Sequence, residues 1–230
     1  MFLPLKDEHP GPNKPYATFI IIVLNCIVYF LSMGRTPQEF NIFIYKYGLI
    51  PYEIVHMTEL TPQYHWPILL SPISSMFTHA GFMHLAGNML YLWIFGNNVE
   101  NHLGPVKFTI FYLVSGLAAA FMFVIFSPNS QIPLVGASGA IAGVMGAYMF
   151  LFPHARILTL LFLFYFIRIM RISAWVILGF WFVYQIFMSA AGGGGGVAWL
   201  AHVGGFGFGY LWFRLVGSRG SPPPKRIYLD

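Results

Sequence analysis

Residues 108–126 read FTIFYLVSGLAAAFMFVIF, an apolar run of 19 residues without a charged side chain. About 20 predominantly apolar residues in a helix are needed to cross the roughly 30 Å hydrocarbon core of a bilayer. The run is therefore predicted to be a membrane-spanning helix. Comparable apolar runs lie on both sides of it in the chain, so this helix is expected to be one of several.

The composition of the whole chain agrees with a lipid environment. Of its 230 residues, 57% are hydrophobic, 19% are aromatic and only 8% are charged, whereas soluble domains carry about 25% charged residues. A globule with so few charges would expose large apolar patches to water. A soluble enzyme, a disordered protein and a nucleic-acid-binding protein are therefore excluded. The basic residues that give the net charge of +5 stand between the apolar runs, where they set the orientation of the chain in the membrane.

The apolar runs predict an all-α fold, a polytopic bundle of six transmembrane helices. The expected spans are residues 16–33, 82–99, 108–126, 138–152, 174–190 and 198–216. They divide the chain into an amino-terminal cytoplasmic segment (1–15), a six-span core (16–216) and a cytoplasmic carboxyl-terminal tail (217–230).

Three connecting segments have distinctive compositions. Residues 34–72 are too polar to cross a membrane and too apolar to float free, so they are expected to form a long interfacial first outer loop with short helices. Residues 157–167 are apolar but short and are followed by Arg168 and Arg171, which places them near the interface. The five consecutive glycines at 192–196 predict a flexible hinge loop.

The basic residues orient this topology. With the amino terminus inside, ten of the twelve lysines and arginines fall on the inner side and two on the outer side. Such a bias predicts that both termini are cytoplasmic. The inner residues are Lys6, Lys14, Lys107, Arg156, Arg168, Arg171, Arg214, Arg219, Lys225 and Arg226, and the outer ones are Arg35 and Lys46.

Polar side chains inside membrane spans are costly and mark functional sites. In this chain most polar residues of the expected spans are found in three short segments. They are the segment around His79, His84 and Asn88, the Gly136-Ala137-Ser138-Gly139 stretch, and the segment around His202. The predicted topology puts all three in the outer part of the membrane at similar depth. None of the seven acidic residues is expected there, so the pattern favours a Ser-His dyad over a triad.

Helix spacing indicates how these groups approach one another. His84 and Asn88 are four residues apart, so on a helix they share one face and are candidate hydrogen-bond donors to an oxyanion. Small residues line the other two helices and would let them pack closely, bringing Ser138 within reach of His202. These small residues are Gly139, Gly143, Gly146 and Ala147 on one helix and Gly205 and Gly209 on the other.

The order of these motifs resembles that of the rhomboid family of intramembrane serine proteases. The resemblance covers most of the chain and implies a fold of six spans without metal or cofactor. It implies that Ser138 is the nucleophile and His202 the general base, with His84, Asn88 and the Ser138 backbone N–H forming the oxyanion hole. His79, Gly136 and Gly139 are expected to support the site.

Two positions depart from the family pattern. Many members carry Trp-Arg in the first outer loop, whereas Trp66 is followed here by Pro67. Some members place a tyrosine four residues after the serine, stacked on the histidine. That position is Ala142 in this chain, so another group is expected to orient the His202 ring.

The resemblance also implies membrane-protein substrates, a lipid bilayer as partner and no nucleic acid or metal. A bacterial inner membrane is expected, with the active site toward the outer face. Two other functions stay open: a small transporter or channel whose polar cavity is lined by the same residues, and an inactive relative that binds and escorts membrane proteins. The serine and histidine disfavour the second, and the restriction of polar groups to the outer half disfavours the first.

Overall fold

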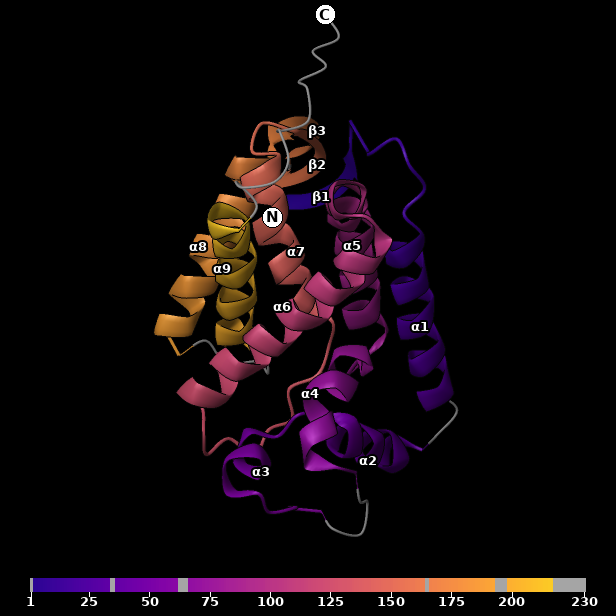
Figure 1. The fold of residues 1–230 in the computed structure, drawn as a ribbon, viewed down its shortest axis with the longest axis vertical. Coiled ribbons are helices and arrows are strands. Elements are labelled where there is room, and N and C mark those ends of the chain that lie inside the picture. The colour runs from indigo at the N-terminus through magenta and orange to yellow at the C-terminus, as the bar shows by residue number, and fades with distance from the viewer. Residues whose placement is uncertain (1, 34–35, 62–65, 164–165, 193–197, 217–230) are drawn as a thin grey trace, which may run out of the picture.

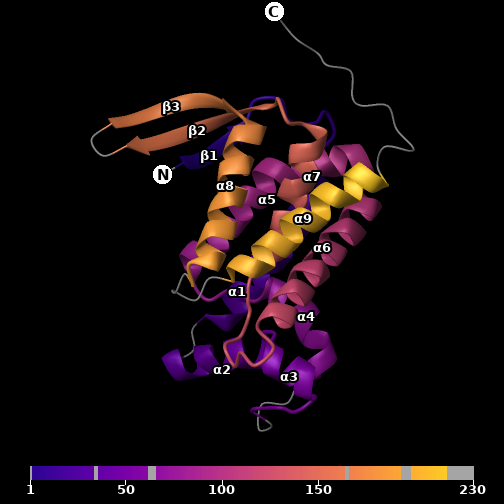
Figure 2. The ribbon, with the colours of Figure 1, turned by 90° about the vertical axis from the view of Figure 1, so that its left-hand side faces the viewer.

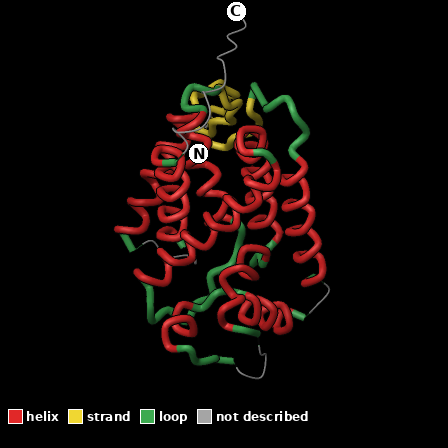
Figure 3. The backbone as a smooth tube through the Cα atoms, viewed as in Figure 1, coloured by secondary structure: helices red, strands yellow, loops and turns green. Residues whose placement is uncertain are grey.

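The computed structural model describes residues 2–33, 36–61, 66–163, 166–192 and 198–216, and most of them are helical (Figures 1 and 3). The helices in chain order are α1 (Tyr16–Ser32), α2 (Pro37–Tyr47), α3 (Pro51–His56), α4 (Ser71–Ser74), α5 (Phe82–Leu103), α6 (Pro105–Phe126), α7 (Ser138–Leu151), α8 (Ala174–Ala190) and α9 (Trp199–Leu215). Two 3-10 turns, Ile68–Leu70 and Ser75–Phe77, flank α4.

One long helix lies at each of the six expected spans, namely α1, α5, α6, α7, α8 and α9, but α5 runs four residues past the expected end of its span and α6 begins three residues before the expected start. Within the described part of the chain, α6 is the helix whose length and composition fit a complete membrane crossing. The apolar helices α1, α7 and α8 have 17, 14 and 17 residues. Large apolar side chains are exposed along the outside of the bundle, as a lipid-facing surface requires.

Short helices lie between α1 and α5, in the segment expected to form an interfacial outer loop. Helices α2, α3 and α4 cross one end of the bundle, below α5 and α6 in Figure 1. Helix α2 begins with a capping box in which the Thr36 hydroxyl accepts from the Glu39 N–H and the Glu39 carboxylate accepts from the Thr36 N–H. The predicted glycine hinge, except Gly192, and the tail 217–230 lie outside the described residues.

The opposite end of the bundle carries a sheet, so the expectation of an all-α fold is incomplete. Strands β1 (Phe2–Asp7), β2 (Arg156–Leu163) and β3 (Phe166–Ser173) form an antiparallel sheet in the order β1-β2-β3. Arg156 pairs with Ser173 and Phe162 with Ile167. The segment expected only to lie near the interface is thus a β-hairpin, because its leucines and isoleucines fit a strand as well as a buried helix.

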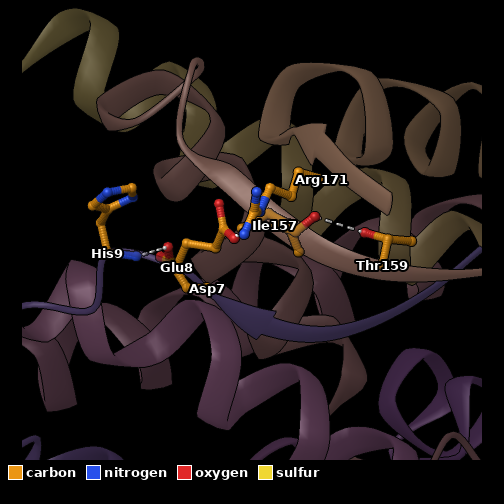
Figure 4. A network of polar contacts seen from close by, with 6 residues as sticks. All are labelled: Asp7, Glu8, His9, Ile157, Thr159 and Arg171. Carbon is orange, nitrogen blue, oxygen red and sulfur yellow. Dashed lines mark hydrogen bonds and ion pairs between the residues drawn. The ribbon is translucent and has the colours of Figure 1, made fainter. Parts of the chain in front are cut away.

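Asp7 fastens this sheet to the bundle. Its carboxylate accepts hydrogen bonds from the Tyr148 hydroxyl of α7 and the Asn98 amide of α5, and from the His9 N–H, which Figure 4 draws. Asp7 is almost fully buried, and this burial raises the pKa of its carboxyl group above the ordinary value. The Asp7 pKa is therefore higher in the folded protein than in the unfolded chain. Its contribution to folding stability is fully present below the unfolded-state pKa and is lost as pH rises through the folded-state pKa.

Helices α7 and α9 touch backbone to backbone, as their small-residue stripes predict. A Cβ atom built on Gly209 would lie 1.9 Å from the Gly143 carbonyl oxygen, and one on Gly205 would lie 2.1 Å from the Gly139 oxygen. A Cβ on Gly146 would meet the Phe206 oxygen at 2.1 Å. The absence of side chains at these positions is therefore what permits the contact.

Adding one methyl group at Gly209 is expected to separate the two helices. Overpacking of this kind costs about 1–3 kcal/mol, so Gly209→Ala should lower the melting temperature of the detergent-purified protein by several degrees. Gly207→Ala is the matched control, two residues away on α9, because a Cβ at Gly207 meets nothing within 4 Å. Equal melting temperatures for the two variants would contradict the close packing described here.

Candidate active site

The α7–α9 contact brings Ser138 and His202 together. Ser138 is the first residue of α7, and His202 lies in the first turn of α9. The Oγ atom of Ser138 and the Nε2 atom of His202 are 2.8 Å apart, a hydrogen-bond distance across 64 residues of sequence. Both side chains are partly buried. A serine hydroxyl within reach of an imidazole is the first requirement for an activated nucleophile.

The second ring nitrogen of His202 has a partner on a third helix. The Oε1 atom of Gln185, on α8, is 2.8 Å from His202 Nδ1, and Gln185 is only 3% exposed. An amide oxygen can only accept a hydrogen bond, so Nδ1 carries the proton in this arrangement. The lone pair of Nε2 then faces the Ser138 hydroxyl, which is the tautomer that a general base needs.

Gln185 is the site residue that sequence reasoning missed. Because Ala142 cannot stack on the His202 ring, the sequence does not show what orients that ring. In the structure the ring contacts Gln185 and the Trp181 ring, whose centroid is 5.7 Å from that of His202. The available signal was an amide within the apolar run 174–190, because an intramembrane polar group is costly unless it has a partner. Its partner is an imidazole, so the hydrogen-bonded chain is Ser138-His202-Gln185 without a carboxylate.

His84 and Asn88 lie on α5 beside the segment that leads into Ser138. A Cβ built on Gly136 would be 2.7 Å from His84 Nε2 and 3.5 Å from Asn88 Nδ2. The Asn88 Nδ2 atom is buried and has no hydrogen-bond partner among the described residues. Gly136 has a φ of +114°, a conformation that side chains rarely adopt, so a glycine is needed there for two reasons.

Backbone N–H groups at the start of α7 are available as hydrogen-bond donors beside these side chains. The N–H groups of the first turn of a helix have no intrahelical acceptor, and Ser138 begins α7, so its own N–H is one of them. The expected donors His84, Asn88 and the Ser138 N–H therefore converge on the same short segment. The arrangement can accommodate negative charge that develops on an oxygen atom next to Ser138.

The remaining predicted positions have packing surroundings. His79 is 1% exposed, and its ring meets the His84 ring edge to face with centroids 5.2 Å apart. Gly139 lies where a Cβ would be 2.7 Å from the Ala119 Cβ, so it lets α7 pack against α6. In the part of the chain that the structure describes, no group of three His, Cys, Asp or Glu side chains is placed to hold a metal ion.

The carboxylate of Glu100, on the same helix as His84, is engaged elsewhere. It accepts from the backbone N–H groups of Ala17 and Thr18 at 2.8 and 2.7 Å and from the Thr18 hydroxyl at 2.7 Å. Glu100 thus satisfies the first turn of α1 at the far end of α5. This location explains why it is not part of the serine-histidine arrangement.

Comparison with known proteins adds a family assignment to this geometry. Residues 68–219 match the family model described as the Rhomboid domain, a range that includes every candidate site residue. The chain is 36% identical to "Rhomboid protein 1, mitochondrial" of Saccharomyces cerevisiae over 220 residues, which are 91% of this chain and 57% of that protein. It is 34% identical to "Rhomboid protease GluP" of Bacillus subtilis over 141 residues, which are 60% of this chain and 25% of that protein.

A third relative is "Presenilin-associated rhomboid-like protein, mitochondrial" of Bos taurus, 34% identical over 39% of this chain and 25% of that protein. The chain thus spans between a quarter and just over half of the length of these relatives. The family model nevertheless matches well over half of the chain, from the 3-10 turn before α4 through α9. The chain belongs to the rhomboid family of integral membrane proteins.

Proposed function

We propose that this protein is an intramembrane serine endopeptidase that hydrolyses peptide bonds in or next to the membrane spans of its substrates. The observation that carries the proposal is the 2.8 Å contact between Ser138 Oγ and His202 Nε2, with Gln185 holding the other ring nitrogen. A structural serine would not require an oriented imidazole beside it. Membership in a family with a relative named as a protease agrees with this assignment.

The proposed reaction is acyl transfer through two half-reactions. Ser138 Oγ attacks the carbonyl carbon of the scissile bond while its proton passes to His202 Nε2. His202 then gives that proton to the nitrogen of the leaving amine as the bond breaks, and an acyl-enzyme remains. In the second half, His202 takes a proton from water, the resulting hydroxide oxygen displaces Ser138, and the proton returns to Oγ.

The oxygen of the substrate carbonyl becomes negatively charged in both half-reactions. Asn88 Nδ2, His84 and the Ser138 N–H are proposed to donate hydrogen bonds to it. The buried amide donor of Asn88 has no partner among the described residues, so an oxyanion would satisfy it at little cost in reorganisation. This is the expected condition of a donor that is set up for a transition state and not for the resting enzyme.

The membrane placement is part of the proposal. We propose that α1, α5, α6, α7, α8 and α9 all cross the bilayer, with both termini on the side that carries the basic excess. The loop helices and the site would then face the outer side. Two of the three relatives described above are mitochondrial by name, which weakens the expectation of a bacterial inner membrane. The orientation rule applies to the bilayer in either case.

A substrate span must enter from the side and unwind, because helical carbonyls are already hydrogen-bonded. Helix α8 has fewer buried residues than any of the other five long helices, and its Phe180, Val183 and Phe187 are about 60% exposed. Lateral entry beside α8 would bring a substrate to Gln185 and His202. Substrates with glycine or proline near the outer face are expected to react best, since these residues weaken helices.

Labelling with a serine-reactive fluorophosphonate tests the nucleophile directly. The wild-type protein in detergent should label, and both Ser138→Ala and His202→Ala should lose the label. Ser115→Ala is the matched control, because Ser115 is another buried serine, on α6, and its loss should leave labelling intact. Equal labelling of wild type and Ser138→Ala would contradict the assignment of the nucleophile.

Asn88→Ala is expected to lower turnover without blocking substrate binding. Removal of one oxyanion donor typically costs a factor of about 10² to 10³ in kcat. Cleavage of a single-span model peptide with a glycine near its outer end, in proteoliposomes, measures this. Asn101→Ala, at the other end of α5, should stay near the wild-type rate. A kcat for Asn88→Ala within twofold of wild type would exclude Asn88 from the oxyanion site.

Gln185 is proposed as a positioning residue that acts through His202. Gln185→Leu leaves the Nδ1–H buried without an acceptor, which costs about 1–3 kcal/mol, so kcat should fall about 10- to 100-fold while KM changes little. Gln185→Glu keeps an acceptor oxygen and should restore most of the rate. Val183→Ala, on the exposed side of α8, is the control. A Leu variant that raises KM alone would assign Gln185 to substrate binding instead.

A further inference from the structure

The β-hairpin formed by β2 and β3 projects sideways from the bundle. Figure 2 shows it running across the end of the helices, beyond α8, and not away along the bundle axis. It starts at Arg156, five residues after α7 ends, and its last residue, Ser173, immediately precedes α8. Since eight strand residues extend about 27 Å, the hairpin covers a considerable distance along the level at which these two helices end.

The outer half of the hairpin carries exposed apolar side chains on both faces. Side chains of a strand alternate between faces, so Ile167 and Ile169 lie on one face and Arg168 and Met170 on the other. Ile167 is 64% exposed, Ile169 62% and Met170 45%, and Phe162, paired with Ile167, is 39% exposed. A sheet face that meets water is normally polar. The face with Ile167 and Ile169 does not suit an aqueous surface.

The exposed apolar surface continues from the hairpin onto α8. Trp175 and Val176 in the first turn of α8 are exposed, and so is Phe180 one turn later. The Phe180 ring also packs against Phe2 of β1, with centroids 5.4 Å apart, so the sheet and the lipid-facing side of α8 form one surface. Tryptophan at the end of a spanning helix is typical of the membrane–water interface.

The charges of the hairpin are positive. Arg171 pairs with Glu8 beside β1, as Figure 4 shows, which holds the hairpin against the amino-terminal strand. Arg168 is exposed and makes no ion pair with any residue that the structure describes. An exposed guanidinium flanked by apolar side chains can place its stem in the apolar layer and its head at the level of lipid phosphates.

We propose that the hairpin lies in the membrane interface and binds anionic phospholipid headgroups. The side chains of Ile167 and Ile169 insert among the upper parts of the acyl chains, and Arg168, on the opposite face of β3, contacts the phosphate of an anionic lipid. Strand β3 is an edge strand of the sheet, so its outward backbone groups stay at the headgroup level, where water and lipid phosphates can bind them. The inference rests on the membrane placement of the chain and is independent of the chemistry of Ser138.

The depth of residue 169 tests the insertion. The chain has a single cysteine, Cys26, so Cys26→Ala provides a background for Ile169→Cys labelled with bimane in nanodiscs. The label should be quenched by shallow spin-labelled lipids and protected from iodide. Val183→Cys on α8 is the lipid-facing control, and Pro12→Cys, exposed before α1, is the water-facing control. Iodide quenching at residue 169 equal to that at residue 12 would overturn the proposal.

Protection from both quenchers would also overturn it, because the hairpin would then be covered by protein, such as a second copy of the chain. Chemical preference is tested with spin-labelled phosphatidylglycerol and phosphatidylcholine as alternative quenchers. One basic residue near a membrane surface favours anionic lipid by about 1 kcal/mol, or about fivefold. Arg168→Gln should bring the two quenchers close to parity, while Lys14→Gln should leave their ratio unchanged.

An unchanged ratio in Arg168→Gln would refute the assignment of Arg168. The same measurements on Ser138→Ala separate this proposal from the proposed protease activity. That variant should show wild-type quenching whether or not the enzyme cleaves peptides, so a failure of the hairpin proposal and a failure of the protease proposal give different results.

Discussion

The contact between α7 and α9 is the constraint on which the site depends. The Gly143 carbonyl oxygen lies 1.9 Å from the position that a Cβ on Gly209 would take, so the two helix backbones are in direct contact. Lipid offers no hydrophobic drive for helices to associate, and close packing of small residues has to supply the attraction. The distance between Ser138 and His202 follows from this packing, since each residue is carried at the end of one of the two helices.

The hydrogen bond from Gln185 ties a third helix to the same site. Helix α8 buries few of its side chains, and Gln185 is one of the four that are fully buried. A displacement of α8 toward the lipid would remove the acceptor from His202 Nδ1 and release the ring. If the proposed entry of a substrate beside α8 holds, that entry and the orientation of the proposed base are coupled through the Gln185 amide.

Much of this arrangement could be predicted from the sequence. Membrane helices are recognised by the length of their apolar runs, and polar residues within them are costly and therefore indicate a functional site. The apolar runs predict the positions of the six long helices, and the glycine spacing predicts the α7–α9 contact. The i, i+4 spacing of His84 and Asn88 places both beside Gly136. These features are local, or they depend on one helix face meeting another of the same pattern.

The features that escaped prediction depend on contacts between distant residues. Strand β1 exists because Phe2–Asp7 pairs with a segment about 150 residues away, and no local pattern specifies that partner. Residues 157–167 are almost all apolar, so the hydrophobic period does not separate strand from helix there. The sequence shows Gln185 as a polar residue in an apolar run, but its hydrogen-bond partner depends on how α8 packs against α9.

The sheet and the site together explain why α7 is the most buried helix of the core. At one end Ser138 is hydrogen-bonded to His202, and at the other the Tyr148 hydroxyl donates to Asp7 of β1. Ten residues separate these anchors, about 15 Å along the helix, and the glycine contacts lie between them. Helix α7 is thus held at both ends and along its length, so under the proposed protease function the motion that admits a substrate is assigned to α8, with α7 as the fixed frame that carries Ser138.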